Sequence, residues 1–120
     1  MESYIEVVEK SLYLTDTILE GLDLIQELLG QGKGEQTLFL FEDVLVAFVT
    51  IKNATESIFN EIKNDINPIY DEIRKILNLV ISYYEDKEYA NLQDILNLKI
   101  IPLFLNLREK LDLAVINIRC

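Results

Sequence analysis

Two pairs of carboxylates in the first quarter of the sequence could do chemistry. The two members of each pair are three residues apart. Glu6 pairs with Glu9, and Glu20 pairs with Asp23. Residues three apart lie on the same side of an α-helix, so each pair could present two oxygen ligands together. Magnesium is held by carboxylate oxygens that converge on one point at about 2.1 Å. The spacing therefore raises the hypothesis of a magnesium-binding site.

The sequence between the two pairs argues against that hypothesis. The pairs resemble those of all-helical nucleotide pyrophosphatases, which implies a magnesium-dependent, all-helical nucleotide hydrolase. Those enzymes gather the pairs from helices that face each other, whereas residues 10–19 contain no turn signal. On one continuous helix Glu9 and Glu20 would lie about 16 Å apart along the axis. The carboxylates also continue a periodic stripe on the side away from Leu22 and Leu29. We expect a solvated acidic face with no metal site, and the hydrolase stays the alternative.

Other catalytic schemes lack their residues. The sequence contains no histidine, which excludes a Glu-x-x-His di-iron site, an imidazole zinc ligand and a histidine-based triad. The single cysteine, Cys120, has no histidine base to activate it. The stretch GQGKGE (30–35) lacks the spacing and the Ser or Thr of a phosphate-binding loop. We therefore expect no catalytic residue, no cofactor and no enzymatic activity.

Three tyrosines near one expected chain reversal offer a third hypothesis. Tyr83, Tyr84 and Tyr89 could line a small-molecule pocket at the rim of a helical domain. Tyrosines at such ends more often bury the ring and leave the hydroxyl in contact with water. A packing role is therefore the simpler expectation.

Composition predicts one soluble cytoplasmic domain that spans residues 1–120. Half of the residues are hydrophobic, and the formal net charge is −10. Such acidity disfavours binding to nucleic acid and to anionic lipid. No apolar run approaches the ~20 residues of a membrane span, and the sequence opens without a secretory signal.

Apolar residues recur at intervals of three and four along most of the chain, which predicts four helices. We expect these helices at about residues 2–29, 36–64, 67–84 and 89–119. Gly30 is the expected left-handed C-cap of the first helix, and Thr37 is the expected N-cap of the second. Asn67 and Pro68 suit the cap and the first position of the third helix.

Pro102 lies inside the fourth predicted helix. The helical spacing of the apolar residues is nevertheless kept across it, in the series Leu92, Leu96, Ile100, Leu103, Leu107, Leu111, Ala114 and Ile118. A proline removes one backbone hydrogen bond and costs about 3 kcal/mol, so it bends a helix without necessarily ending it. An edge strand is the competing interpretation. We expect an all-α fold, an antiparallel up-down-up-down four-helix bundle with a proline-kinked fourth helix.

More apolar residues are present than a four-helix monomer can bury. The surplus residues, which fall off the core stripes, are Phe39, Val46, Val49, Leu105, Leu113, Val115 and Ile116. Large exposed apolar patches usually mark protein interfaces, and a two-fold homodimer is the commonest arrangement. We therefore expect a homodimer that acts as an adaptor or a small chaperone, with binding to a different protein as the main alternative.

The stretch EYANLQDILNLKIIPLF (88–104) resembles a pattern in a family of small uncharacterised all-helical proteins of Gram-positive bacteria. The residues that carry the match are Tyr89, Asp94, Ile95, Leu96, Ile100 and Pro102. The chain departs from the pattern at Gln93, where a small residue is expected, and it has no tryptophan after the proline. The resemblance implies a helix that bends at Pro102 and implies no activity.

Overall fold

The computed structural model describes residues 4–56 and 63–119, and every element in these ranges is helical. The elements are α1 (Tyr4–Gly30), the 3₁₀ turn η1 (Gly34–Thr37), α2 (Leu38–Glu56), α3 (Lys63–Glu85), α4 (Tyr89–Ile95), the π-helical turn η2 (Leu96–Ile100) and α5 (Ile101–Arg119). The predicted all-α class is confirmed, and the described ranges contain no strand near Pro102.

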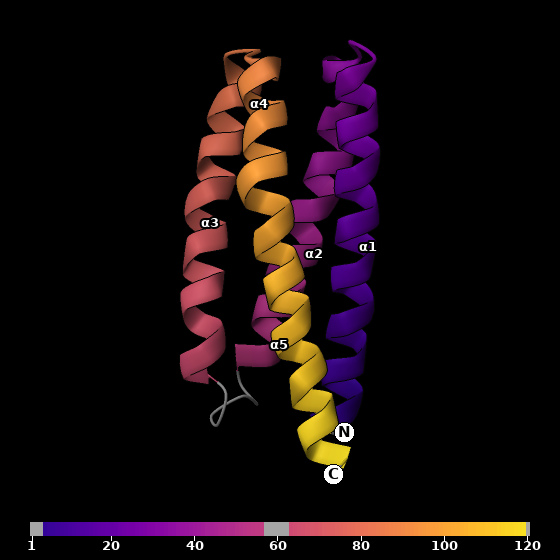
Figure 1. The fold of residues 1–120 in the computed structure, drawn as a ribbon, viewed down its shortest axis with the longest axis vertical. Coiled ribbons are helices and arrows are strands. Elements are labelled where there is room, and N and C mark those ends of the chain that lie inside the picture. Colours follow the sequence, from indigo (N-terminus) through magenta and orange to yellow (C-terminus); the bar gives the residue numbers. More distant parts are fainter. Residues whose placement is uncertain (1–3, 57–62, 120) are drawn as a thin grey trace.

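The helices lie side by side along the longest axis of the molecule, which measures 46 Å (Figure 1). α1 packs against both α2 and α5, while α3 packs against the continuous helix formed by α4, η2 and α5. α2 also contacts α3, but this contact is much smaller than the contacts just described. α2 and α5 meet through the core, where the rings of Phe48 and Phe104 are 5.9 Å apart.

The core is built from the apolar stripes that the sequence predicts. α1 contributes Val8, Ile18, Leu22, Ile25 and Leu29, all of which are buried. The acidic residues of α1 lie on the opposite side of the helix, as expected for an amphipathic helix. Each fully buried Leu or Ile contributes about 1.5–3 kcal/mol, so this stripe holds α1 against its two neighbours.

The fourth predicted helix continues through Pro102 by way of the π turn. The Ile101 amide donates to the carbonyl of Leu96, five residues earlier, and Pro102 itself is exposed. Gln26 of α1 supports the preceding turn, because its Nε2 donates to the Gln93 carbonyl at 3.2 Å. A π turn holds more residues than an α turn. After this turn, the residues that face the core therefore come one position later in the sequence than regular α-helical spacing predicts.

That shift corrects one predicted core residue. Phe104 is completely buried, whereas Leu103 is only partly buried, so the prediction of Leu103 as a core residue was wrong. The register then continues through Leu107, Leu111 and Ala114, which are buried as predicted. Ile118 lies outside the residues whose side chains the structure describes.

Two predicted helix ends are also corrected, and a third lies outside the described residues. α1 ends in a Schellman motif whose left-handed residue is Gly32 (φ 75°), not Gly30, and the Lys33 amide donates to the Leu28 carbonyl at 2.9 Å. α2 is described as far as Glu56, and residues 57–62 of the predicted second helix lie outside the described ranges. α3 begins at Lys63, so Pro68 lies within that helix and Asn67 is not its cap.

Two threonine–tyrosine hydrogen bonds connect the α2 side of the molecule with α3. Thr37 Oγ1 and Tyr84 Oη are 2.8 Å apart, and Thr55 Oγ1 and Tyr70 Oη are 2.7 Å apart. Thr37 also donates to the Gly34 carbonyl at 2.7 Å, so its hydroxyl holds η1 against α3 in place of the predicted N-cap. These bonds supplement the limited contact between α2 and α3.

We expect alkaline pH to weaken the fold through Tyr70. Burial raises the pKa of Tyr70 to about 12, and the hydrogen bond with Thr55 lowers it by a smaller amount. The folded protein therefore holds this proton more tightly than the unfolded chain does. The resulting stabilisation, on the order of 2–3 kcal/mol, is complete below pH 10 and is lost as the pH rises from about 10 to about 12.

Denaturant unfolding of the wild type and of Tyr70→Phe between pH 8 and pH 12 measures this effect. The variant should be less stable at pH 8 by about 1 kcal/mol, because the hydrogen bond between Tyr70 and Thr55 is lost while Thr55 keeps its bond to the Ile51 carbonyl. It should lose less stability than the wild type on the alkaline side. Equal alkaline losses in the two proteins would show that Tyr70 does not carry the effect.

Two glycines should respond to alanine in opposite directions. A Cβ on Gly21, inside α1, would lie 3.7 Å from Val44 Cγ2, an ordinary contact. Gly21→Ala should therefore stabilise the protein by about 0.5–1 kcal/mol through helix propensity. A Cβ on Gly34 would lie 2.6 Å from the Tyr89 ring, so Gly34→Ala should be destabilising. Thermal melting of both variants checks the pair, and a stabilised Gly34→Ala would contradict the packing described for Tyr89.

Candidate protein-interaction surfaces

Most of the predicted surplus residues are exposed. Phe39 is 75% exposed and Val46 is 66% exposed, and Val49, Leu105, Leu113 and Ile116 also lie at the surface. Val115 is the exception. It is only 7% exposed because it packs in the core beside Ala114, so its assignment to the interface was wrong.

The exposed residues form two separate surfaces. The first, here called the α2 face, consists of Phe39, Val46 and Val49, whose spacings of seven and three place them on one side of the helix. The second, the α5 face, consists of Leu98, Leu105, Leu113 and Ile116. α2 and α5 face each other through the core, so these outward residues point to opposite sides of the molecule.

Leu98 is the member of the α5 face that the sequence did not single out. It is 68% exposed and lies in the π turn, seven residues before Leu105. Leu98 lies two residues before buried Ile100, and Leu105 lies two residues before buried Leu107, so both point away from the core. The seven-residue spacing was the available signal, although Leu96 and Ile100, two residues away on either side, concealed it.

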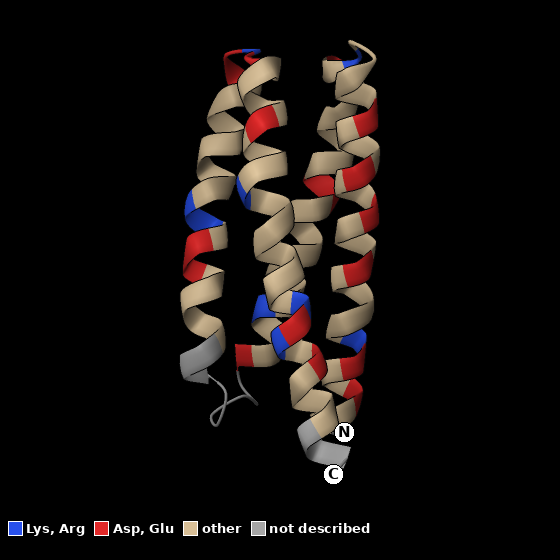
Figure 2. Cartoon of the chain, viewed as in Figure 1, with Lys and Arg blue, Asp and Glu red and all other residues tan. Residues whose placement is uncertain are grey.

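The two faces differ in the charges around them. Acidic and basic residues occur together in the middle of α5, where Arg108, Glu109 and Lys110 are consecutive (Figure 2). Between Phe39 and Val46, by contrast, the charged residues of α2 are Glu42 and Asp43, which are both exposed. The α5 face therefore has mixed charge, and the α2 face is acidic along this stretch.

One ion pair ties the mixed-charge part of α5 to α1. Arg108 Nε donates to Asp16 Oδ1, and this hydrogen bond is the main cause that raises the pKa of the Arg108 guanidinium. Both side chains are more than two-fifths exposed, so we expect the pair to contribute less than about 1 kcal/mol. Asp16 is thus an interhelical partner within the acidic stripe of α1.

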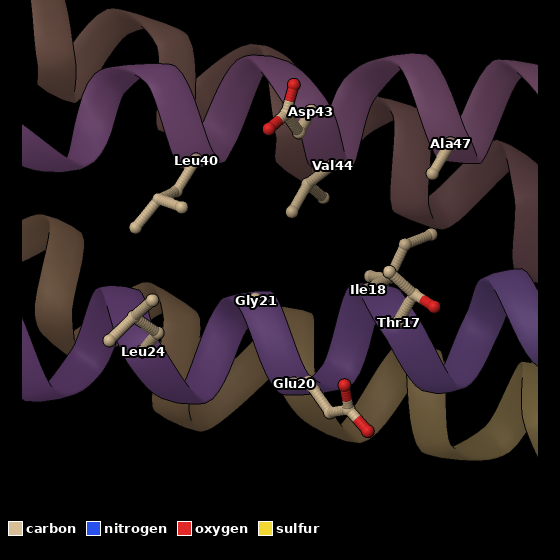
Figure 3. A pocket seen from close by; sticks show the side chains of 9 residues that line it. All are labelled: Thr17, Ile18, Glu20, Gly21, Leu24, Leu40, Asp43, Val44 and Ala47. Atoms are coloured by element: carbon tan, nitrogen blue, oxygen red, sulfur yellow. The ribbon is translucent and has the colours of Figure 1, made fainter.

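A groove of about 290 Å³ lies between α1 and α2 on one flank of the α2 face. Leu40 and Val44 point from α2 toward α1, and Ile18 points back from α1 (Figure 3). Gly21 leaves room between them because it has no side chain. The groove therefore extends the apolar surface of α2 toward α1.

A second groove, of about 340 Å³, lies between α2 and α3 on the other flank of the α2 face. Its lining residues are Leu38, Phe41, Glu42, Leu45, Ile81, Tyr84 and Glu85. The rings of Phe41 and Tyr84, 5.1 Å apart, are both part of this lining. α2 and α3 share little direct contact, which leaves this groove open between them.

The paired carboxylates of α1 do not come together. Glu6, Glu9, Glu20 and Asp23 all lie on the uninterrupted helix Tyr4–Gly30, so the two pairs remain about 16 Å apart along it. Among the described residues there is no group of three or more carboxylate or cysteine side chains placed to hold a metal ion. The geometry of these residues offers no support for the hydrolase hypothesis.

The tyrosine cluster contributes to packing at one end of the molecule. Tyr84 bonds to Thr37, and the ring of Tyr89 lies against Gly34. Burial raises the pKa of Tyr84, an effect that its hydrogen bond to Thr37 partly offsets. A shallow hollow of about 310 Å³ beside Tyr89 is otherwise lined by residues 32–36. These contacts explain the cluster without a ligand.

Comparison with known proteins adds a family but no named relative. None of the helices in the described ranges has the length and apolar character needed to cross a membrane. No curated protein and no solved structure matches the chain. A family described as "Domain of unknown function (DUF8042)" matches residues 6–110, a range that includes the stretch 88–104 singled out above. The chain therefore belongs to the DUF8042 family.

Proposed function

We propose that this chain is a cytoplasmic, non-enzymatic protein of a Gram-positive bacterium that works through protein contacts, as a homodimeric adaptor or a small chaperone. The observation that carries the proposal is the pair of exposed apolar faces on α2 and α5. Exposed apolar surface of this kind is costly in water and usually marks an interaction site.

The proposed arrangement of each subunit is an antiparallel up-down-up-down bundle with helix one as α1, helix two as α2, helix three as α3, and helix four as α4 to α5. Short connections support it, because only residues 31–33 separate α1 from η1 and only residues 86–88 separate α3 from α4. The two ends of the chain lie at the same end of the molecule (Figure 1), as an even number of alternating helices requires.

We assign self-association to the α5 face. A two-fold interface brings the same surface of both copies together, so its charges must be compatible with themselves. The mixed charges around Glu109 and Lys110 can pair between two copies, whereas Glu42 and Asp43 of the α2 face would repel their equivalents. The dimer then leaves the α2 face of each subunit accessible to another protein, as an adaptor or chaperone needs.

Sedimentation equilibrium over a range of concentrations tests this assignment with two matched variants. Leu105→Glu/Ile116→Glu places carboxylates on the α5 face, and Val46→Glu/Val49→Glu adds the same charge to the α2 face. We expect a dimeric wild type and a dimeric α2 variant. The α5 variant should dissociate at least about 100-fold more readily, because the charged residues cannot be buried without a partner.

All four positions are exposed, so both variants should keep the wild-type helix content and melting cooperativity. A monomeric wild type at the highest concentration would contradict the proposal, as would dissociation of the α2 variant alone. In the first case the apolar faces would belong to contacts with other proteins.

Magnesium titration followed by thermal melting separates the proposal from the hydrolase alternative. A protein with a metal site gains stability as the metal binds the folded state. We expect magnesium to act on this protein only as a weak salt, with the same response in wild type and in Glu9→Gln/Glu20→Gln. A saturable rise in melting temperature that this variant abolishes would favour the hydrolase.

A further inference from the structure

We propose that the groove between α2 and α3 binds an amphipathic α-helix of a partner protein, one whose apolar stripe is flanked by Lys or Arg. The inference rests on the proposed function and specifies the class of partner that the α2 side of the dimer would recognise.

The packing of the molecule leaves this groove available. α2 is supported by α1, and α3 is supported by α4, η2 and α5, so neither helix depends on the other for most of its burial. The hydrogen bonds of Tyr84 and Tyr70 to Thr37 and Thr55 connect the two sides at separate points along α3. The apolar groove lies at the Tyr84 end, where Leu38 and Ile81 are among its lining residues.

The length of the groove suits a helix. Leu38 and Leu45 are seven residues apart on α2, which corresponds to about 10 Å, or two helical turns. A bound helix with apolar residues at positions i, i+3 or i+4, and i+7 presents anchors over the same length. A peptide that binds by strand addition would need a free strand edge, and the described ranges contain no strand.

The charges of the groove select a basic partner. Among the residues that the structure describes, the charged ones that line the groove are Glu42 on α2 and Glu85 on α3, both exposed, and no lysine or arginine lines it. The nearby Lys87 pairs with a carboxylate outside the groove, because its Nζ lies 3.3 Å from Glu35 Oε1. A second copy of this chain is a poor occupant, because a two-fold interface at this groove would place Glu42 and Glu85 against their own equivalents.

Fluorescence anisotropy with two helix-stabilised peptides tests the inference. Both carry leucines at i, i+3, i+4 and i+7; one has lysines beside the stripe, and its twin has glutamates at the same positions. We expect the lysine peptide to bind roughly tenfold more tightly than its twin at low ionic strength, where exposed charge pairs are least screened. Glu42→Lys/Glu85→Lys should reverse this preference.

A matched control separates a local effect from one of net charge. Glu20→Lys/Asp43→Lys makes the same charge change in the groove between α1 and α2, and it should leave the preference for the lysine peptide within about threefold of the wild type. Equal affinity for both peptides, no binding of either, or an equal loss in the control variant would overturn the inference. The groove lies within one subunit, so the Leu105→Glu/Ile116→Glu variant should bind the peptide as the wild type does, whether or not dimerisation through α5 is correct.

Discussion

The arrangement depends on one constraint, that the last helix must pass Pro102 without losing contact with the core. A proline has no amide hydrogen and crowds the preceding turn. The π turn Leu96–Ile100 places this defect at an exposed position and moves the inward residue from Leu103 to Phe104. Phe104 can then meet Phe48 of α2 across the core. Without that register shift, α5 could not join the packing that begins at α4.

The composition of α2 explains why the surface is unusual. This helix is apolar on nearly every side, and a helix of that kind must be surrounded to be fully buried. In this molecule α2 has its main neighbour on the α1 side and only a limited contact with α3. Phe39 and Val46 therefore remain exposed, and a groove lies on each flank. The proposed dimer does not cover Phe39, Val46 or the two grooves. We therefore propose a second partner for this side of the molecule.

The sequence predicts the helical period far better than it predicts local deviations from it. The four helical segments and the core stripe of α1 follow from apolar spacing alone. The burial of Phe104 in place of Leu103 does not follow from apolar spacing, because the residue types give no clear signal for a π turn. Val115 was misassigned for a related reason, since its burial depends on how the neighbouring helices pack, which the residue types do not show. The surplus residues form two opposed faces with different charges. The sequence alone could not predict this, because it does not show which helices are neighbours.

The central claim is that two copies meet through the α5 face and leave the α2 face outward, and distances between spin labels on the two copies test it most directly. With Cys120 replaced by serine, a single label goes on exposed Asn106 of α5 or on exposed Thr50 of α2. The account predicts that the Asn106 labels lie closer together than the 22 Å width of one molecule. The Thr50 labels should be farther apart than that width. A short Thr50 distance with a long Asn106 distance, or no coupling between copies, would contradict it.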